Sequence, residues 1–153
     1  MKTLFTFVCF TLLSTQCVSK KALDNQVDSN TKEVVFVYKY YTRGFYKEHH
    51  VGQEKIITFL DYAKTKFTEK DVIPMDWKNT LDLLTKIDLT AFENLEAPSS
   101  LRHTDRVQHG ELTIKINNTT FRSRNFDHGN PPEKIKSIVT QLLAMSEGNQ
   151  NQN

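Results

Sequence analysis

The segment from Phe126 to Pro132, Phe-Asp-His-Gly-Asn-Pro-Pro, comes closest in its residue types to a chemical site. Asp127 and His128 could provide acid–base chemistry in a small hydrolase if a nucleophile from elsewhere in the chain joined them. The same string also suits the entry to a helix, with Asp127 or Asn130 as the capping residue and two prolines that stiffen the corner. A third use is a rigid exposed loop that presents Asp127 and His128 to a partner.

The other residues that could do chemistry lack partners at a useful spacing. The chain has no Gly-x-Ser-x-Gly elbow and no His-Glu-x-x-His motif. The adjacent His49 and His50 would point to opposite faces of a strand, so they cannot easily bind one ion together. His103, Asp105 and His109 share one polar segment and could converge on zinc, but without the short spacing that marks such a site. We therefore expect no resident metal, no cofactor and no enzymatic activity.

The first seventeen residues, which hold both cysteines, Cys9 and Cys17, indicate export. Residues 1–17 comprise a basic start, an apolar run over 4–13 and a short polar exit, which is the pattern of a secretory signal too short to span a bilayer. This end resembles a bacterial lipoprotein signal of Bacteroidota type, with Cys17 as the residue that accepts the lipid. The alternative is ordinary cleavage after Cys17 or Ser19, without a lipid.

Lipidation at Cys17 would attach the protein to a membrane through its N-terminus and place it in the cell envelope, on the periplasmic side or at the surface. Residues 18–32 are mostly polar and would form a flexible tether. Residues 33–146 are expected to fold as a single domain, and the polar residues 147–153 to form a disordered tail.

The charge balance argues against a nucleic-acid partner. The chain has 20 Lys and Arg against 18 Asp and Glu, and the leader removes only Lys2, which leaves a net charge of +1. A domain that binds nucleic acid would show a basic excess.

Hydrophobic periodicity predicts an α+β fold, with a small antiparallel sheet of four to five strands packed with two amphipathic helices. The expected elements are strands at 33–41, 45–51, 54–60, 111–116 and 119–124, a helix from Pro74 to about Ile87, a short helical turn within 88–97, and a last helix that starts at Pro131. Tyr38 and Tyr40 lie on an apolar face of the first strand that should meet the core. The polar segment 101–110 is expected to be a long loop.

From Tyr40 to Met145, the order of these features resembles emfourin, a family of small inhibitors of thermolysin-like metallopeptidases. The likeness consists of Arg43-Gly44-Phe45 at the end of the first strand, a helix with Trp77, a hairpin at 111–124, and Asp127 before the two prolines and the closing helix. The chain has one glycine at 44 where the family has a Gly-Gly pair. The same order is also similar to small exported proteins of Bacteroidota-type bacteria. The emfourin resemblance implies binding to a peptidase without catalysis.

We therefore expect a non-catalytic exported lipoprotein domain that binds a protein, either as an accessory envelope component or, alternatively, as an emfourin-like inhibitor of a thermolysin-like metallopeptidase. A small hydrolase is the second alternative. The candidate partner-binding surface consists of Arg43, Phe45, Asp127 and His128.

Overall fold

The structure is a computed structural model that describes residues 33–148. In chain order its elements are β1 (Val34–Tyr41), β2 (Tyr46–Val51), β3 (Lys55–Phe59), β4 (Phe67–Asp71), α1 (Pro74–Leu84), the 3₁₀ turns η1 (Phe92–Asn94) and η2 (Leu101–Thr104), β5 (His109–Ile116), β6 (Thr119–Arg122), β7 (Phe126–Asp127) and α2 (Glu133–Glu147). The signal at 1–17 with Cys17, the tether at 18–32 and residues 149–153 lie outside the described residues. Within the described range, no helix combines the length and the apolar character needed to cross a membrane.

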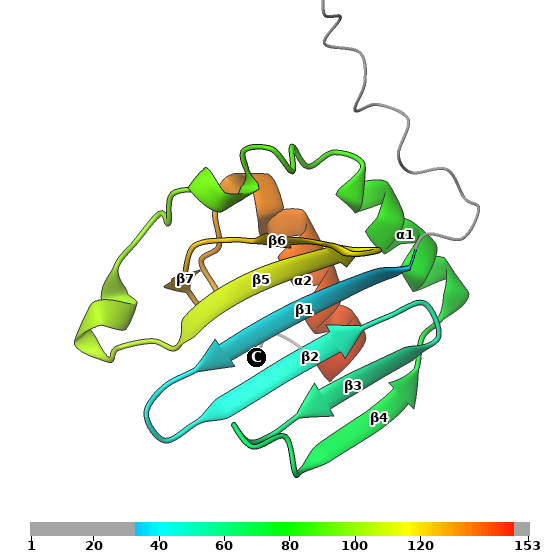
Figure 1. Cartoon of the computed structure of the whole chain (residues 1–153). Coiled ribbons are helices and arrows are strands. Elements are labelled where there is room, and N and C mark those ends of the chain that lie inside the picture. The colour runs from blue at the N-terminus through cyan, green and yellow to red at the C-terminus, as the bar shows by residue number, and fades with distance from the viewer. Residues whose placement is uncertain (1–32, 149–153) are drawn as a thin grey trace, which may run out of the picture.

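The strands form one antiparallel sheet in the order β4-β3-β2-β1-β5-β6, and β7 pairs with the start of β5 (Figure 1). The predicted α+β class and the two amphipathic helices are confirmed. The sheet has seven strands, more than the four or five expected. The short β7 and the edge strand β4 account for the difference.

The edge strand β4 carries no apolar pattern that predicts a strand. All five of its residues, Phe-Thr-Glu-Lys-Asp, are exposed. It is held by backbone pairing to β3, with Phe67 opposite Phe59, and by ion pairs from Lys55 to Glu69 and Asp71 at 3.1 and 2.8 Å. Charged side chains on an exposed edge also discourage pairing with another chain.

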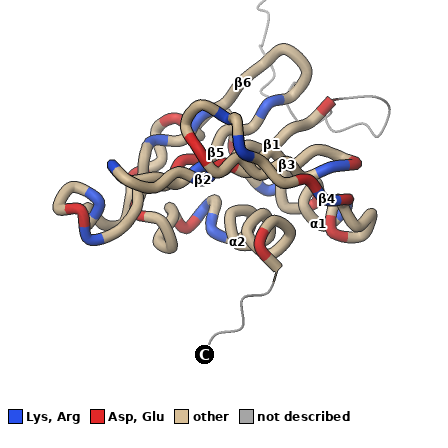
Figure 2. The backbone as a smooth tube through the Cα atoms, turned by 90° about the horizontal axis from the view of Figure 1, so that it is seen from below, with Lys and Arg blue, Asp and Glu red and all other residues tan. Residues whose placement is uncertain are grey.

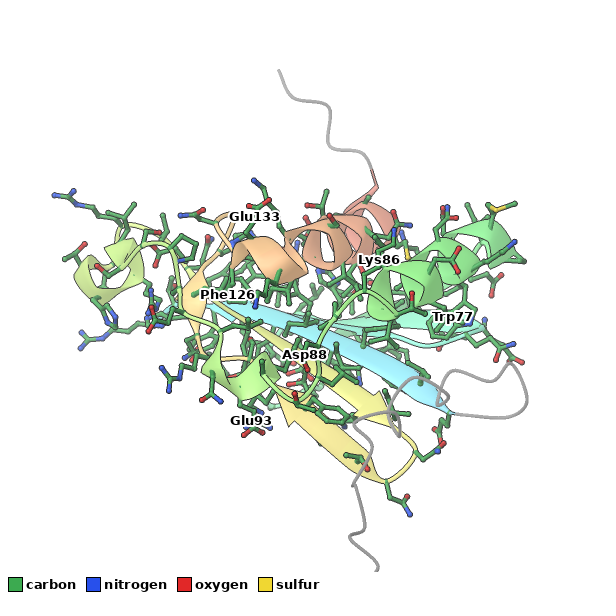
Figure 3. The ribbon with its side chains drawn as sticks, turned by 90° about the horizontal axis from the view of Figure 1, so that it is seen from above. Trp77, Lys86, Asp88, Glu93, Phe126 and Glu133 are labelled. Carbon is green, nitrogen blue, oxygen red and sulfur yellow. The ribbon has the colours of Figure 1, made fainter. Side chains whose placement is uncertain are left out.

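The core lies between one face of the sheet and the two helices. Phe36, Tyr38 and Tyr40 of β1 point into it and are almost fully buried, as their alternation predicts. Trp77 of α1 packs edge-on against Phe36 with the ring centroids 5.8 Å apart. The apolar stripe of α2, also as predicted, is buried and consists of Ile135, Ile138, Val139, Leu142 and Met145. Figure 3 shows the side chains that fill this layer between the helices and the sheet.

The segment 101–110 is not one long loop, which corrects the prediction. It contains the turn η2, and β5 already begins at His109. His109 pairs with Tyr41, and Gly110 pairs with Tyr40. The polar sequence does not predict this first part of β5, because the strand is defined here by its pairing with β1 and not by an alternation of apolar residues.

The helix α2 begins later than a cap at Asn130 would place it. Its first residue is Glu133, and the residue at the N-cap position, Pro132, forms no side-chain hydrogen bond to the helix. Asn130 instead donates through Nδ2 to the Ser99 hydroxyl at 2.7 Å. The proline pair therefore extends the connection before the helix starts.

At its other end, α2 includes Glu147, which we expected to open the disordered tail. The Glu147 carboxylate accepts a hydrogen bond from the Tyr40 hydroxyl and pairs with Lys47 Nζ at 2.9 Å. These contacts hold the last helical turn against β1 and β2.

Gly110 is the position where β5 passes closest to the core rings. A Cβ placed there would lie 2.8 Å from Phe126 Cε2 and 3.1 Å from the Tyr38 hydroxyl oxygen, and both rings are fully buried. We expect Gly110→Ala to lower the free energy of unfolding by about 1–3 kcal/mol, because neither ring can move away. Urea denaturation measures this change.

Gly44→Ala is the matched control, because a Cβ at Gly44 would meet nothing within 4 Å. Its effect should stay within about 0.5 kcal/mol. Equal stability of the two variants would contradict the close packing at Gly110.

Candidate functional site

Within residues 33–148, one face of the sheet carries no helix. Both α1 and α2 pack against the core face, as the view along the sheet shows (Figure 2). The opposite face, called the open face below, is turned toward the viewer in Figure 1. On β1 it carries Val35, Val37, Lys39 and Tyr41, which alternate with the buried residues of that strand.

A cavity of about 270 Å³ lies in the middle of the open face. Its floor is formed by Val37 and Thr113, which are paired neighbours on β1 and β5 and are 8 % and 5 % exposed. The longer side chains that surround this floor are Lys39, Glu48, His50, Lys64, Glu111, Lys115 and Arg122. Two short β-branched residues among long ones create the depression.

Glu48 forms one wall of the cavity and is almost buried. Its carboxylate accepts hydrogen bonds from the His50 ring, from Lys64 Nζ at 2.6 Å and from the Tyr46 hydroxyl. Burial alone would raise the pKa of Glu48, but the hydrogen bonds from these donors outweigh it and lower that pKa to about 2. Glu48 is therefore an anion at neutral pH and holds Lys64 and His50 at the rim.

Glu111 forms the facing wall in the same way. It pairs with Lys39 Nζ at 3.0 Å and with Arg122 Nε at 3.5 Å. Lys115 forms no ion pair within residues 33–148. The lining holds four Lys or Arg side chains and two carboxylates, so the cavity has a formal charge of +2 when His50 is left out of the count.

Aromatic side chains lie beside the cavity on the open face. Tyr46 and Tyr62 pack with centroids 4.3 Å apart, and Tyr41 stacks on His109 at 5.3 Å. Phe67 extends this group of rings onto the edge strand. Tyr62 and Phe67 are each 58 % exposed, although the Tyr62 hydroxyl donates to the Thr42 carbonyl oxygen. The open face therefore presents rings next to a charged centre.

The structure brings together two residues of the predicted partner surface. Phe45 and His128 both contact the ring of Tyr40: Phe45 lies 5.5 Å away, and His128 stacks at 4.0 Å with an interplanar angle of 6°. His128 Nδ1 also shares a hydrogen bond with the Tyr38 hydroxyl at 2.9 Å. Arg43 is exposed in the turn that holds Phe45. This group lies near the end of α2 and away from the open-face cavity.

Asp127 does not belong to that group, which corrects the predicted surface. It is buried, and its carboxylate accepts hydrogen bonds from the Ser99 hydroxyl, from the backbone N–H groups of Leu101 and Arg102, and from the Arg102 guanidinium. Burial opposes ionisation, but these donors hold the pKa of Asp127 well below its ordinary value. Asp127 anchors the segment 99–102, and its carboxylate is not paired with His128.

A second polar cluster lies on the core side, beneath the end of α2. His49 is 1 % exposed, and its Nδ1 shares a hydrogen bond with the Thr58 hydroxyl at 2.8 Å. Its Nε2 lies 3.4 Å from a Glu147 carboxylate oxygen without forming a hydrogen bond. Burial lowers the pKa of His49 to about 4, although the Glu147 charge acts in the opposite direction. His49 is therefore neutral at pH 7.

The histidines of the polar segment do not assemble with Asp105. The rings of His103 and His109 meet edge to face at 6.4 Å, and Asp105 ends the turn η2. In the part of the chain that the structure describes, no three His, Cys, Asp or Glu side chains are arranged to hold a metal ion.

Comparisons with protein-family models, with curated proteins and with solved structures found no match for this chain.

Sequence reasoning missed the open-face cavity. Its residues come from strands far apart in the chain, such as Glu48 of β2 and Glu111 of β5, which both lie opposite Lys39. The sequence carries one sign of this site, namely the solvent-exposed face of β1, where the charged Lys39 lies between Val37 and Tyr41. Only the register of both neighbouring strands turns that signal into a site.

The burial of His49 predicts a loss of stability in acid. The unfolded chain takes up this proton near pH 6.5 and the folded chain only near pH 4, so acid favours the unfolded state between these values. We expect this residue to account for a loss of about 2–3 kcal/mol of unfolding free energy on going from neutral pH to pH 4. Urea denaturation across that range should show a shallower pH dependence for His49→Asn than for the unmodified chain.

His103→Asn is the control, because His103 is exposed on η2. Its pH dependence should follow that of the unmodified chain. A His49→Asn chain with an unchanged pH dependence would show that His49 does not carry this effect.

Proposed function

We propose that this protein is a non-catalytic binding domain of the cell envelope, exported by residues 1–17, anchored by a lipid on Cys17, and attached to a protein partner through the open face of its sheet. The export and the anchor rest on the sequence pattern of the leader. The proposed binding to a protein partner is inferred from the residues that the open face presents.

The observation that carries the proposal is the composition of that face. It combines exposed rings, such as Tyr62 and Phe67, with a charged depression in its middle. Aromatic side chains and arginine are enriched in protein interfaces, and exposed apolar patches on a small domain mark interaction sites. The ion pairs of Glu48 and Glu111 already order the rim, which reduces the entropic cost of binding.

The arrangement of Asp127 and His128 supports binding over hydrolysis. The two side chains contact different groups, Asp127 the segment 99–102 and His128 the rings of Tyr38 and Tyr40. Each has a structural role where it lies.

Site-specific photo-cross-linking in the native envelope tests the proposed face. A benzophenone amino acid replaces Phe67 on β4 or Thr120 on β6, two exposed open-face positions, or, as controls, Lys78 on α1 or Lys136 on α2. We expect one discrete adduct of the same mass from both open-face positions and none from the helices. Adducts from the helix positions alone, or from no position, would reject the open face as the binding surface.

The second candidate function is inhibition of a thermolysin-like metallopeptidase. One observation favours it: the turn with the exposed Arg43 and Phe45 lies beside the partly exposed His128, so two segments far apart in the chain meet at the ring of Tyr40. Rigid connections of this kind suit a protein that blocks a larger one.

Thermolysin itself is the probe for that function. If the turn blocks the peptidase, an excess of the full chain slows peptide hydrolysis, and Phe45→Ala weakens the inhibition about tenfold, as truncation of an interface anchor does. Met75→Ala is the matched control, because Met75 is an exposed apolar residue on α1. An unchanged rate of hydrolysis at excess chain would exclude inhibition of this peptidase.

A further inference from the structure

The open-face cavity offers several cationic hydrogen-bond donors, and its two carboxylates are already engaged by cations. Both wall carboxylates, Glu48 and Glu111, already bind cations. Each of these cations retains donors, because an ammonium has three N–H groups and a guanidinium has five. The side chains of Lys64 and Arg122 are 42 % and 62 % exposed, so their remaining donors can reach a ligand.

The charge of the cavity indicates an anionic ligand of low charge. Its formal charge of +2 favours an anion. Lys115 contributes to this charge and forms no ion pair within residues 33–148, so replacing it would break none there. The carboxylates of Glu48 and Glu111 lie beside the same space and would repel a group with several negative charges. Lys115 is the one lining cation without an ion pair within residues 33–148, and a single carboxylate is the ligand that would pair with it.

The size of the cavity points to one side chain. A volume of about 270 Å³ is just below the range of about 300–1,000 Å³ in which small-molecule pockets fall. The cavity also lies beside the rings of the open face, and interfaces concentrate their binding energy in a few anchor residues. Both features favour an anchor that belongs to a larger partner.

We propose that the cavity receives one aspartate or glutamate side chain of the protein partner, which is bound by Lys39, Lys64, Lys115 and Arg122. The proposal rests on the proposed function and names the residue type that the open face recognises. Val37 and Thr113 form the floor on which the carboxylate's methylene group lies.

Methyl NMR of the full chain tests this pocket directly. The probe is N-acetyl-glutamate α-amide, and its glutamine analogue is the neutral control. We expect saturable shifts of the Val37 and Thr113 methyl signals with a Kd of about 1–10 mM, as suits a single side chain, and no shift with the glutamine analogue. The signals of Ile114 and Leu142 on the core side should not move, and they report that each variant is folded.

A charge reversal at the rim supplies the matched variants. Lys115→Glu should raise the Kd for the glutamate probe at least about tenfold. Lys86→Glu makes the same charge change beyond α1 and should leave the Kd unaltered. Equal shifts with the glutamine analogue, no shift with the glutamate probe, or an unaltered Kd in Lys115→Glu would each overturn the proposal.

Two further probes test whether the cavity binds an acidic side chain, a free phosphate or a membrane surface. Inorganic phosphate and phosphatidylglycerol vesicles should shift the Val37 and Thr113 signals less than the glutamate probe at equal anion concentration. A stronger response to phosphate would make the cavity a general anion site, and a stronger response to vesicles would make it a membrane contact. Either result would overturn the assignment to an acidic side chain.

The cross-linking and the NMR titration can fail separately. An open-face adduct without a glutamate-dependent shift rejects the carboxylate pocket and leaves the binding function intact. A glutamate-dependent shift without any open-face adduct rejects the protein partner.

Discussion

β1 lies between β2 and β5, and its register with both strands decides which side chains meet on each face of the sheet. Phe36 faces Val51 and Ile114, and Tyr38 faces His49 and Leu112, so the large buried side chains gather on one side. A slip by one residue would exchange the two faces and place these rings in water. The burial of Phe36 and Tyr38 therefore also determines the composition of the open face.

The same register gives each face its own way of accommodating polar groups. On the open face, Lys39 lies between Glu48 and Glu111, so unlike charges are cross-strand neighbours. On the core side, His49 is kept neutral by burial, and Glu147 is held by hydrogen bonds at the end of α2. The open-face charges remain near water, and the surplus of cations among them gives the cavity its preference for anions.

The predictable part of this fold is the part that buries apolar residues at a regular period. The alternation in β1 and the stripe of α2 from Ile135 to Met145 are of this kind. The edge strand β4 has no such pattern, and the beginning of β5 at His109 depends on pairing with Tyr41. The predicted surface joined Asp127 to His128 on one exposed loop, yet Asp127 ends β7 and is buried against the segment 99–102, whereas His128 lies in the turn that follows. The cavity was not predictable, because it exists only once β2, β1 and β5 are in register.

Oxidative footprinting of side chains in the native envelope and in the purified chain tests most directly whether the open face is the functional surface. Tyr62 and Phe67 on the open face and Met75 on α1 are similarly exposed, at 58 %, 58 % and 63 %, so each should be oxidised in the purified chain. The account predicts that Tyr62 and Phe67 are protected in the envelope and that Met75 is not. Protection of Met75 alone, or equal oxidation of all these residues in both samples, would contradict it.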